Sequence, residues 1–212
     1  MTDNASRSAG GGHDAVAGVL LAAGEGSRLG RPKALVEVGG KRLIDRGVAL
    51  LAEGGAAPVV AVTGAAVVSV PGVPGVITVH NPGWRTGMGS SLAAGLAAVP
   101  AGCQAAVVAL ADQPLVGPAA VQRLIGAYRA GATVAVAAYH GRPRNPVLLA
   151  REHWPAVTAL AAGDVGARPF LRAHPDLVTQ VECADTGSPD DVDTPADLAR
   201  VERILAAARS PR

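Results

Sequence analysis

The regular alternation of short valine-rich runs with alanine-rich segments is the feature that most constrains the fold of this chain. Five apolar runs occur, at residues 15–22, 58–64, 75–80, 105–111 and 133–139. Nearly continuous apolar runs of this length are typical of strands that are buried on both faces of a sheet. Three segments with helical spacing, each followed by or ending in glycine or proline, separate them: residues 42–55, 87–99 and 117–131. The alternation predicts an α/β fold with a mostly parallel, doubly wound sheet.

The C-terminal third is less regular, and both ends of the chain differ from the body. Its pattern predicts strands at residues 144–150 and 176–183 and helices at residues 151–163, 164–175 and 194–210. The last helix begins with Thr-Pro and carries an acid in its first turn, which is good capping chemistry. Residues 1–14 are small and polar with three consecutive glycines, so we expect a disordered tail. Residues 15–212 are then long and apolar enough for one domain.

Composition argues against several classes of partner. The net charge is +2, aromatic residues are 2% of the chain and no Lys/Arg run is present, so we expect no nucleic-acid binding. Residues 54–79 carry no charge, but prolines and glycines interrupt them, which favours two buried strands over a membrane span. Cys103 and Cys183 are far apart, the histidines lack zinc-ligand spacing and no secretion signal is visible. We therefore expect a cytoplasmic protein without a membrane partner.

The segment at residues 20–35, LLAAGEGSRLGRPKAL, changes from an apolar run into a loop with three glycines and three cationic side chains. Exposed backbone N–H groups and cations between a strand and a helix are typical of phosphate-binding loops. Two common loops do not match. The dinucleotide fingerprint has Leu29 at its third glycine position, and Lys33 lies between proline and alanine instead of in Gly-Lys-Ser/Thr. The segment therefore predicts a phosphate loop of another kind, since a structural turn explains only one or two of its glycines.

Six segments together form a recognisable ordered set. They are LAAGEGSRLGRPK (21–33), NPGWRTGMGSSLAAGL (81–96), ALADQPLV (109–116), GRPRNPVLL (141–149), GDVGAR (163–168) and DDVDTPADL (190–198). The set resembles the MobA-like nucleotidyltransferases, and among them most of all the molybdenum cofactor cytidylyltransferases. It covers nearly the whole chain after the tail. The resemblance implies a Rossmann-like sheet of the nucleotide-diphospho-sugar transferase type, which binds a nucleoside triphosphate and transfers its nucleotidyl group to a phosphorylated acceptor.

The resemblance assigns the catalytic cations to the glycine loop. Phosphoryl transfer depends mainly on alignment and charge neutralisation. Lys33 carries a compact charge that can follow the α-phosphate, and Arg28 presents a planar fork to phosphate oxygens. Either side chain would otherwise be a solvated loop cation. The other residues of this loop that are expected to bind the nucleotide are Leu21, Ala22, Ala23, Gly24, Gly26 and Ser27.

Two aspartates are the expected magnesium ligands. Asp112 follows an apolar strand, at the carboxyl edge where open α/β sheets bind their ligands. Mg²⁺ is bound by one or two carboxylates together with substrate phosphates, and Asp193 matches the second ligand of the family. Asp193 is also suited to be a helix N-cap. Spacing alone leaves Asp190 and Asp191 open as alternatives.

The start of the helix at residues 87–99 is expected to pack against the nucleoside. Gly89, Ser90 and Ser91 are the residues that the resemblance places there, through main chain and hydroxyl groups. A helix-capping role for Ser90 is the competing interpretation.

The acceptor is expected to bind to the variable half of the chain. The family pattern points to Asn145, Asp164 and Arg168, where a cation would suit the phosphate of an anionic molybdopterin. Arg142 and Arg144 are weaker candidates, because exposed arginines are common on soluble surfaces.

The leading hypothesis is a Mg²⁺-dependent transfer of CMP from CTP to molybdenum-loaded molybdopterin, with release of pyrophosphate. CTP is favoured because residues 22–24 are Ala-Ala-Gly, as in the cytidylyl members. A guanylyltransferase, or a transferase for another phosphorylated acceptor, remains an alternative. Two further classes are a non-catalytic nucleotide-binding factor that assists maturation of a molybdoenzyme partner, and a redox enzyme of Rossmann type.

Overall fold

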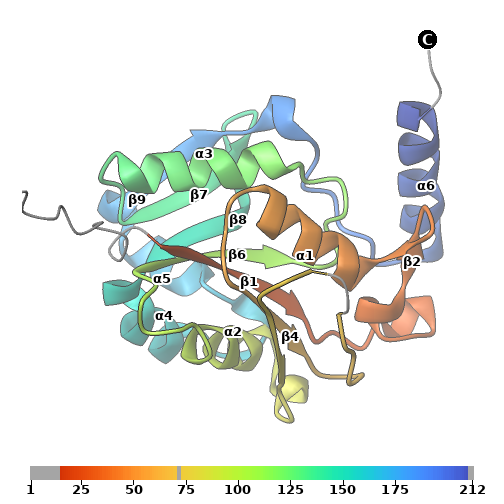
Figure 1. The fold of residues 1–212 in the computed structure, drawn as a ribbon, viewed down its shortest axis with the longest axis horizontal. Coiled ribbons are helices and arrows are strands. Elements are labelled where there is room, and N and C mark those ends of the chain that lie inside the picture. Colours follow the sequence, from red (N-terminus) through yellow and green to blue (C-terminus); the bar gives the residue numbers. More distant parts are fainter. Residues whose placement is uncertain (1–14, 71–72, 210–212) are drawn as a thin grey trace, which may run out of the picture.

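A seven-stranded mixed sheet forms the centre of the molecule (Figure 1). The computed structural model describes residues 15–70 and 73–209. The strand order is β5-β4-β1-β6-β8-β7-β9. The strands are β1 (Val16–Ala22), β4 (Val59–Thr63), β5 (Val76–His80), β6 (Ala105–Leu110), β7 (Val134–Tyr139), β8 (Arg142–Ala150) and β9 (Val178–Glu182). Within this sheet only β8 runs antiparallel to its neighbours, β6 and β7. The predicted mostly parallel α/β fold is confirmed.

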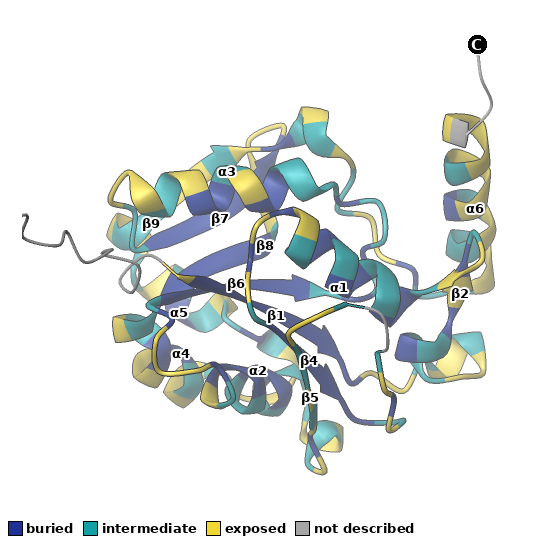
Figure 2. Ribbon diagram, viewed as in Figure 1, coloured by how far each residue is buried: buried dark blue, intermediate teal, exposed yellow. Residues whose placement is uncertain are grey.

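Helices cover both faces of the sheet, as a doubly wound fold requires (Figure 1). On one face lie α1 (Leu43–Glu53) and α3 (Pro118–Arg129), and on the other lie α2 (Met88–Ala97), α4 (Trp154–Leu160) and α5 (Arg168–Ala173). Figure 2 shows the central strands buried between these two layers. Successive side chains of β1 alternate between the two cores, because neighbouring residues of a strand point to opposite faces. Leu20 belongs to the core under α1 and α3, and Val19 to the core under α2.

Local chain geometry differs from the sequence prediction at two hairpins. A small one, β2 (Glu37–Val38) with β3 (Lys41–Arg42), precedes α1 and turns through two glycines with positive φ. The other joins β7 to β8 through His140 and Gly141, whose φ values are 54° and 72°. This tight turn starts β8 at Arg142, two residues before the predicted strand, and it makes β8 antiparallel.

The C-terminal helix α6 (Pro195–Arg209) stands at the edge of the molecule beside β2 (Figure 1). Val201 is fully buried, whereas Ile204 is exposed, so only part of the helix contacts the body. The predicted tail at residues 1–14 and the end of the predicted last helix lie outside the described residues. Among the helices of residues 15–70 and 73–209, none combines the length and hydropathy that a bilayer-crossing segment requires.

The order and register of the strands bring the predicted site segments together. β1 pairs with β6 in parallel, and Leu21 lies opposite Leu110. Both strands therefore end at the same edge, where the glycine loop after β1 lies next to the residues that follow β6. This carboxyl edge is the usual ligand site of open α/β sheets.

Candidate active site

The glycine loop after β1 folds back on itself and returns Lys33 to the end of the strand. The backbone N–H of Lys33 donates a hydrogen bond to the carbonyl of Gly24, at 3.1 Å. Gly26 has a φ of 63°, and a Cβ at this position would overlap the carbonyl oxygen of Arg31. Glycine is therefore required at position 26 both for its backbone conformation and for the close approach of the returning chain.

Lys33 forms ion pairs with both predicted metal ligands, Asp112 and Asp193. Its Nζ atom lies 2.5 Å from Asp112 Oδ2 and 2.5 Å from Asp193 Oδ1. Burial opposes the ammonium charge, but the ion pair with Asp112 and the hydrogen bonds to both carboxylates outweigh it and raise the pKa of Lys33. Asp112 follows β6 and Asp193 precedes α6, so three distant segments meet at one charged centre.

The two alternative aspartates differ in their environment. Burial raises the pKa of Asp191, and the negative charge of Asp112 acts in the same direction. Asp191 Oδ1 also accepts a hydrogen bond of 3.0 Å from the side chain of Gln113. Asp190 instead forms an ion pair with Arg200, at 2.7 Å. Asp191 thus belongs to the electrostatic environment of the charged centre, while Asp190 is engaged on the surface.

The donor set at this centre fits Mg²⁺. Carboxylate oxygens are the ligands that Mg²⁺ prefers, and it completes its coordination with water and substrate phosphates. Asp112 and Asp193 are the residues that would hold it. No group of three or more His, Cys, Asp or Glu side chains within the described parts of the chain forms a ready metal site. Two carboxylates fit a metal that is bound together with a triphosphate.

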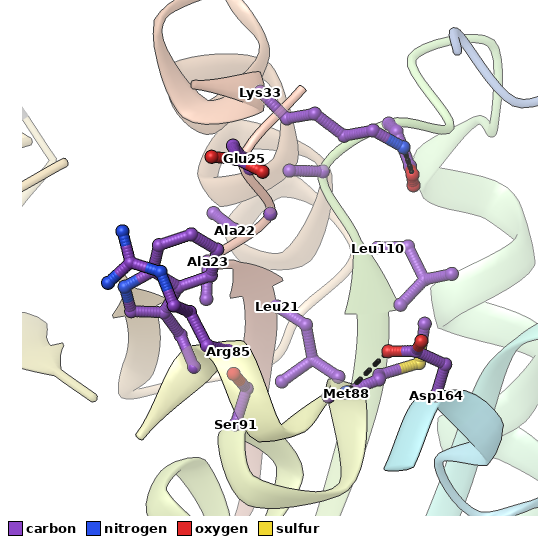
Figure 3. A pocket seen from close by; sticks show the side chains of 15 residues that line it. Leu21, Ala22, Ala23, Glu25, Lys33, Arg85, Met88, Ser91, Leu110 and Asp164 are labelled. Atoms are coloured by element: carbon purple, nitrogen blue, oxygen red, sulfur yellow. Dashed lines mark hydrogen bonds and ion pairs between the residues drawn. The ribbon is translucent and has the colours of Figure 1, made fainter. Parts of the chain in front are cut away.

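A cavity of about 500 Å³ opens at the carboxyl edge beside Lys33 (Figure 3). Its lining residues come from β1, the glycine loop, the start of α2 and the end of β6: Leu21, Ala22, Ala23, Gly24, Glu25, Lys33, Trp84, Arg85, Gly87, Met88, Ser91, Leu110, Ala111, Asp112 and Asp164. The predicted nucleotide residues from Leu21 to Gly24 are among them. Ser27 and Arg28 are exposed on the loop, outside this lining. Of the two predicted catalytic residues, Lys33 therefore lines the cavity, whereas Arg28 lies on the exposed part of the glycine loop.

The start of α2 is held by a buried asparagine. Asn81 Nδ2 donates hydrogen bonds to the hydroxyls of Ser90, at 2.9 Å, and Ser91, at 3.1 Å. The Ser90 hydroxyl is also placed to donate to the carbonyl of Gly87, at 2.9 Å. Gly89 packs against the carbonyl of Ala161, which leaves no room for a Cβ. Of the three predicted nucleoside contacts, Ser91 lines the cavity, while Ser90 and Gly89 hold the helix start in position.

A second cavity, of about 770 Å³, lies next to the first, and Leu110 lines both. Its lining residues are Leu110, Gln113, Val136, Pro143, Arg144, Asn145, Val147, Arg168, Leu171, Arg172, Pro175, Val178, Gln180 and Asp191. Two of the predicted acceptor residues, Asn145 and Arg168, are in this set. The third, Asp164, lines the first cavity and accepts a 3.3 Å hydrogen bond from the backbone N–H of Met88.

Three arginines give the second cavity a cationic wall. They are Arg144, Arg168 and Arg172, and no ion pair joins any of them to an acid in the described residues. Arginine forks without an acidic partner are suited to bind phosphate or carboxylate groups.

Sequence reasoning missed several residues that line the first cavity, and two of them are Trp84 and Arg85. Both lie within the segment 81–96, whose pattern already indicated a site. A tryptophan beside an arginine in a loop gives no periodic signal, so only the folded chain shows that both side chains face the cavity.

Comparison with known proteins places the chain in a family and identifies structures with the same fold. The family described as MobA-like NTP transferase domain matches residues 18–178. The chain is 39% identical over 197 residues to nicotine blue oxidoreductase of Paenarthrobacter nicotinovorans, across 88% of this chain and 96% of that protein. Its structure resembles the Rv0371c homologue from Mycobacterium sp. strain JC1, with a TM-score of 0.78, 28% identity and coverage of 93% of this chain and 100% of that one. It also shares its fold with a nucleotidyl transferase from Methanothermobacter thermautotroptrophicus, with a TM-score of 0.74, 21% identity and coverage of 92% and 99%.

Proposed function

Because the chain belongs to the MobA-like NTP transferase family, we propose that it transfers CMP from CTP to a molybdopterin-type acceptor. The observation that carries this proposal is the meeting of Lys33, Asp112 and Asp193, of which Lys33 and Asp112 line the first cavity. A cation beside a glycine loop is suited to align a triphosphate and neutralise its charge, and the two carboxylates would hold the metal ion that phosphoryl transfer also uses.

The reaction uses the two cavities as two substrate sites. An oxygen of the acceptor phosphate forms a bond to the α-phosphorus of the triphosphate, and the bond from the α-phosphorus to the bridging oxygen breaks, so that pyrophosphate leaves with that oxygen. The nucleotide occupies the first cavity and the acceptor the second. Leu110 lines both cavities and lies just before Asp112 in the chain, so the α-phosphate would react near Asp112.

The chain's own groups supply most of the electrostatic stabilisation. Lys33 neutralises charge on the α-phosphate as the leaving group departs, and the N–H groups of the glycine loop bind the outer phosphates. Asp112 and Asp193 would hold Mg²⁺, which would supply further charge neutralisation on the phosphates. In the second cavity, Arg168 and Asn145 orient the acceptor.

The choice of CTP rests on the Ala-Ala-Gly sequence at residues 22–24, which lies in the lining of the first cavity. A guanylyl transfer, another phosphorylated acceptor and a non-catalytic maturation factor are the alternatives within the same fold.

A second candidate function is an oxidoreductase activity of the kind named for the Paenarthrobacter relative. Identity of 39% across 88% of this chain favours it. Against it, Leu29 interrupts the dinucleotide fingerprint, whereas the charged centre of Lys33 suits phosphate chemistry.

A nucleotide panel distinguishes these functions. Thermal shift with Mg²⁺ and CTP, GTP, UTP or ATP is expected to give the largest stabilisation with CTP, because a ligand of the folded state raises the unfolding temperature. Pyrophosphate release is then measured with purified molybdopterin, with Asp112→Asn as the inactive control. Binding without turnover favours the maturation factor. An oxidoreductase would be established if NADH or NADPH raised the unfolding temperature of the protein and was oxidised by it, while no triphosphate changed the unfolding temperature.

A further inference from the structure

A tryptophan and an arginine form a stacked pair in the wall of the first cavity. The Cζ atom of Arg85 lies 4.5 Å from the ring centroid of Trp84. Both residues come from the short turn between β5 and α2, and both line the cavity. Aromatic residues are 2% of the chain, and Trp84 is the aromatic side chain that the described lining of this cavity contains. The pair is therefore a distinctive feature of a mainly aliphatic site.

The turn that carries the pair is firmly anchored. The backbone N–H of Gly83 donates a 2.9 Å hydrogen bond to Asn81 Oδ1, and the amide of the same buried asparagine binds the start of α2. Trp84 packs closely on the end of β4, because a Cβ placed at Gly64 would lie 2.6 Å from Trp84 Cβ and 2.7 Å from Ala23 Cβ. Trp84 is thus held against the glycine loop, and Arg85 is held on Trp84.

Arg85 is not engaged by an acid. The arginines at positions 42, 123 and 200 each pair with an aspartate, but no ion pair involves Arg85 within the described residues. Stacking on an indole uses the face of the guanidinium, so it fixes the position of the group without using its N–H donors. Those donors are left for a ligand.

The pair lies at the end of the cavity opposite to the charged centre. In Figure 3, Lys33 and Arg85 are on opposite sides, with Ala22 and Ala23 between them. A nucleoside triphosphate whose phosphates lie at Lys33 therefore directs its base toward Arg85 and Ser91.

The chemistry of the guanidinium then discriminates among bases. Arginine has five N–H donors and no acceptor, in a planar fork. Cytosine offers two neighbouring acceptors, O2 and N3, and guanine offers O6 and N7. Uracil and adenine present a donor next to each acceptor along the corresponding edges, so one arm of the fork would meet another N–H group.

We propose that Arg85, positioned by Trp84, reads the nucleobase and selects CTP and GTP over UTP and ATP. This inference rests on the proposed nucleotidyl transfer and names the residue that sets its base selectivity. The wild-type protein therefore binds CTP and GTP about tenfold more tightly than UTP and ATP, in the range that one bidentate base contact supplies.

The test compares four nucleotides with a ligand that has no base. Dissociation constants for CTP, GTP, UTP, ATP and inorganic tripolyphosphate are measured by calorimetry with Mg²⁺. In Arg85→Met the preference for CTP and GTP over UTP and ATP is expected to fall to within about twofold, with tripolyphosphate affinity unchanged. Arg85→Lys keeps the charge but not the fork, so it is expected to lose selectivity as well. Arg129→Met, an exposed arginine at the end of α3, is the matched control and keeps selectivity.

Fluorescence gives an independent readout of where the base binds. Trp84 and Trp154 are the two tryptophans of the chain, so Trp154→Phe leaves Trp84 as the single reporter. CTP is expected to change its emission, and tripolyphosphate is not, because only the nucleotide brings a base to the stacked pair.

Three results would overturn the inference. They are wild-type affinities that do not distinguish the bases, an Arg85→Met variant that keeps wild-type selectivity, and equal weakening of tripolyphosphate and nucleotides, which would make Arg85 a phosphate ligand. A wild-type protein that binds no triphosphate would overturn the proposed function itself, and this outcome is distinct from the other three.

Discussion

The ammonium of Lys33 and the carboxylate of Asp112 lie 2.5 Å apart, although 79 positions separate them in the chain. They meet because β1 and β6 are neighbours in the sheet and Leu21 pairs with Leu110. The same ammonium contacts Asp193, so a cation of the protein stands between the two carboxylates that are proposed to hold Mg²⁺. Lys33 and the metal therefore compete for the same oxygens until phosphates give Lys33 another partner.

Replacing Lys33 by methionine is expected to strengthen metal binding and weaken catalysis. Loss of the competing charge raises the affinity of the nucleotide-free protein for Mn²⁺, a spectroscopic substitute for Mg²⁺, and isothermal titration or electron paramagnetic resonance measures it. Turnover falls by about 10²–10³-fold, as expected on removal of one group that stabilises transition-state charge. Arg31→Met, which removes an exposed cation of the same loop, leaves Mn²⁺ affinity unchanged. Weaker Mn²⁺ binding by the Lys33 variant would contradict the competition.

Two aspartates three positions apart provide a matched pair of variants. Asp193→Asn is expected to lower the rate of pyrophosphate release about 10²-fold or more, because it removes a charged ligand from the phosphate site. Asp190→Asn breaks the surface ion pair with Arg200, which contributes at most about 1 kcal/mol to stability, and leaves turnover within about twofold. Equal losses of turnover in both variants would show that Asp193 is not a specific ligand of the phosphate site.

Two glycines of the loop differ only in the space around them. Gly26 and Gly30 have φ values of 63° and 69°, so alanine at either position costs about 1 kcal/mol of stability. A Cβ at Gly26 would also overlap the Arg31 carbonyl and lie 3.1 Å from the backbone nitrogen of Lys33, whereas nothing lies within 4 Å of one at Gly30. Gly26→Ala is therefore expected to lose more unfolding free energy and to displace Lys33, with a large loss of turnover. Denaturant unfolding and turnover measure both effects, and similar values for the two variants would refute this role of Gly26.

A buried tyrosine makes stability depend on alkaline pH. Burial raises the pKa of Tyr139 to about 12, and the neighbouring Cys183 acts in the same direction. The unfolded chain loses this proton near pH 10, so the stability from the neutral hydroxyl is complete below pH 10 and is lost as the pH rises toward 12. Between pH 8 and 11 the wild-type protein should lose about 1 kcal/mol of unfolding free energy relative to Tyr139→Phe. Tyr128→Phe, which leaves the buried hydroxyl in place, should show the wild-type decline. If the unfolding free energies of wild type and Tyr139→Phe changed in parallel with pH, the alkaline loss of stability would not come from the Tyr139 hydroxyl.

The predicted elements agree with the structure where the residue types of a single segment are enough to show that it is a buried strand. The apolar run at residues 105–111 is observed as β6, Ala105–Leu110, because a strand between two helical layers must be apolar at every position. The antiparallel direction of β8 was not predictable in this way, since it depends on the turn at His140 and Gly141 and on pairing with distant strands. Likewise, the division of Asp164 from Asn145 and Arg168 between two cavities depends on the path of the chain around α2 and α5.

The sequence by itself determined the class of fold, because hydrophobic periodicity is a local property of the chain, and its resemblance to the MobA-like nucleotidyltransferases made Lys33, Asp112 and Asp193 candidate site residues. The tertiary structure decided that these three side chains share one centre, that Trp84 and Arg85 face the same cavity, and that a second cavity with a cationic wall lies beside it. The physical reason is that strand order and register, which bring residues up to 160 positions apart into contact, arise from packing of the whole sheet and not from any one segment.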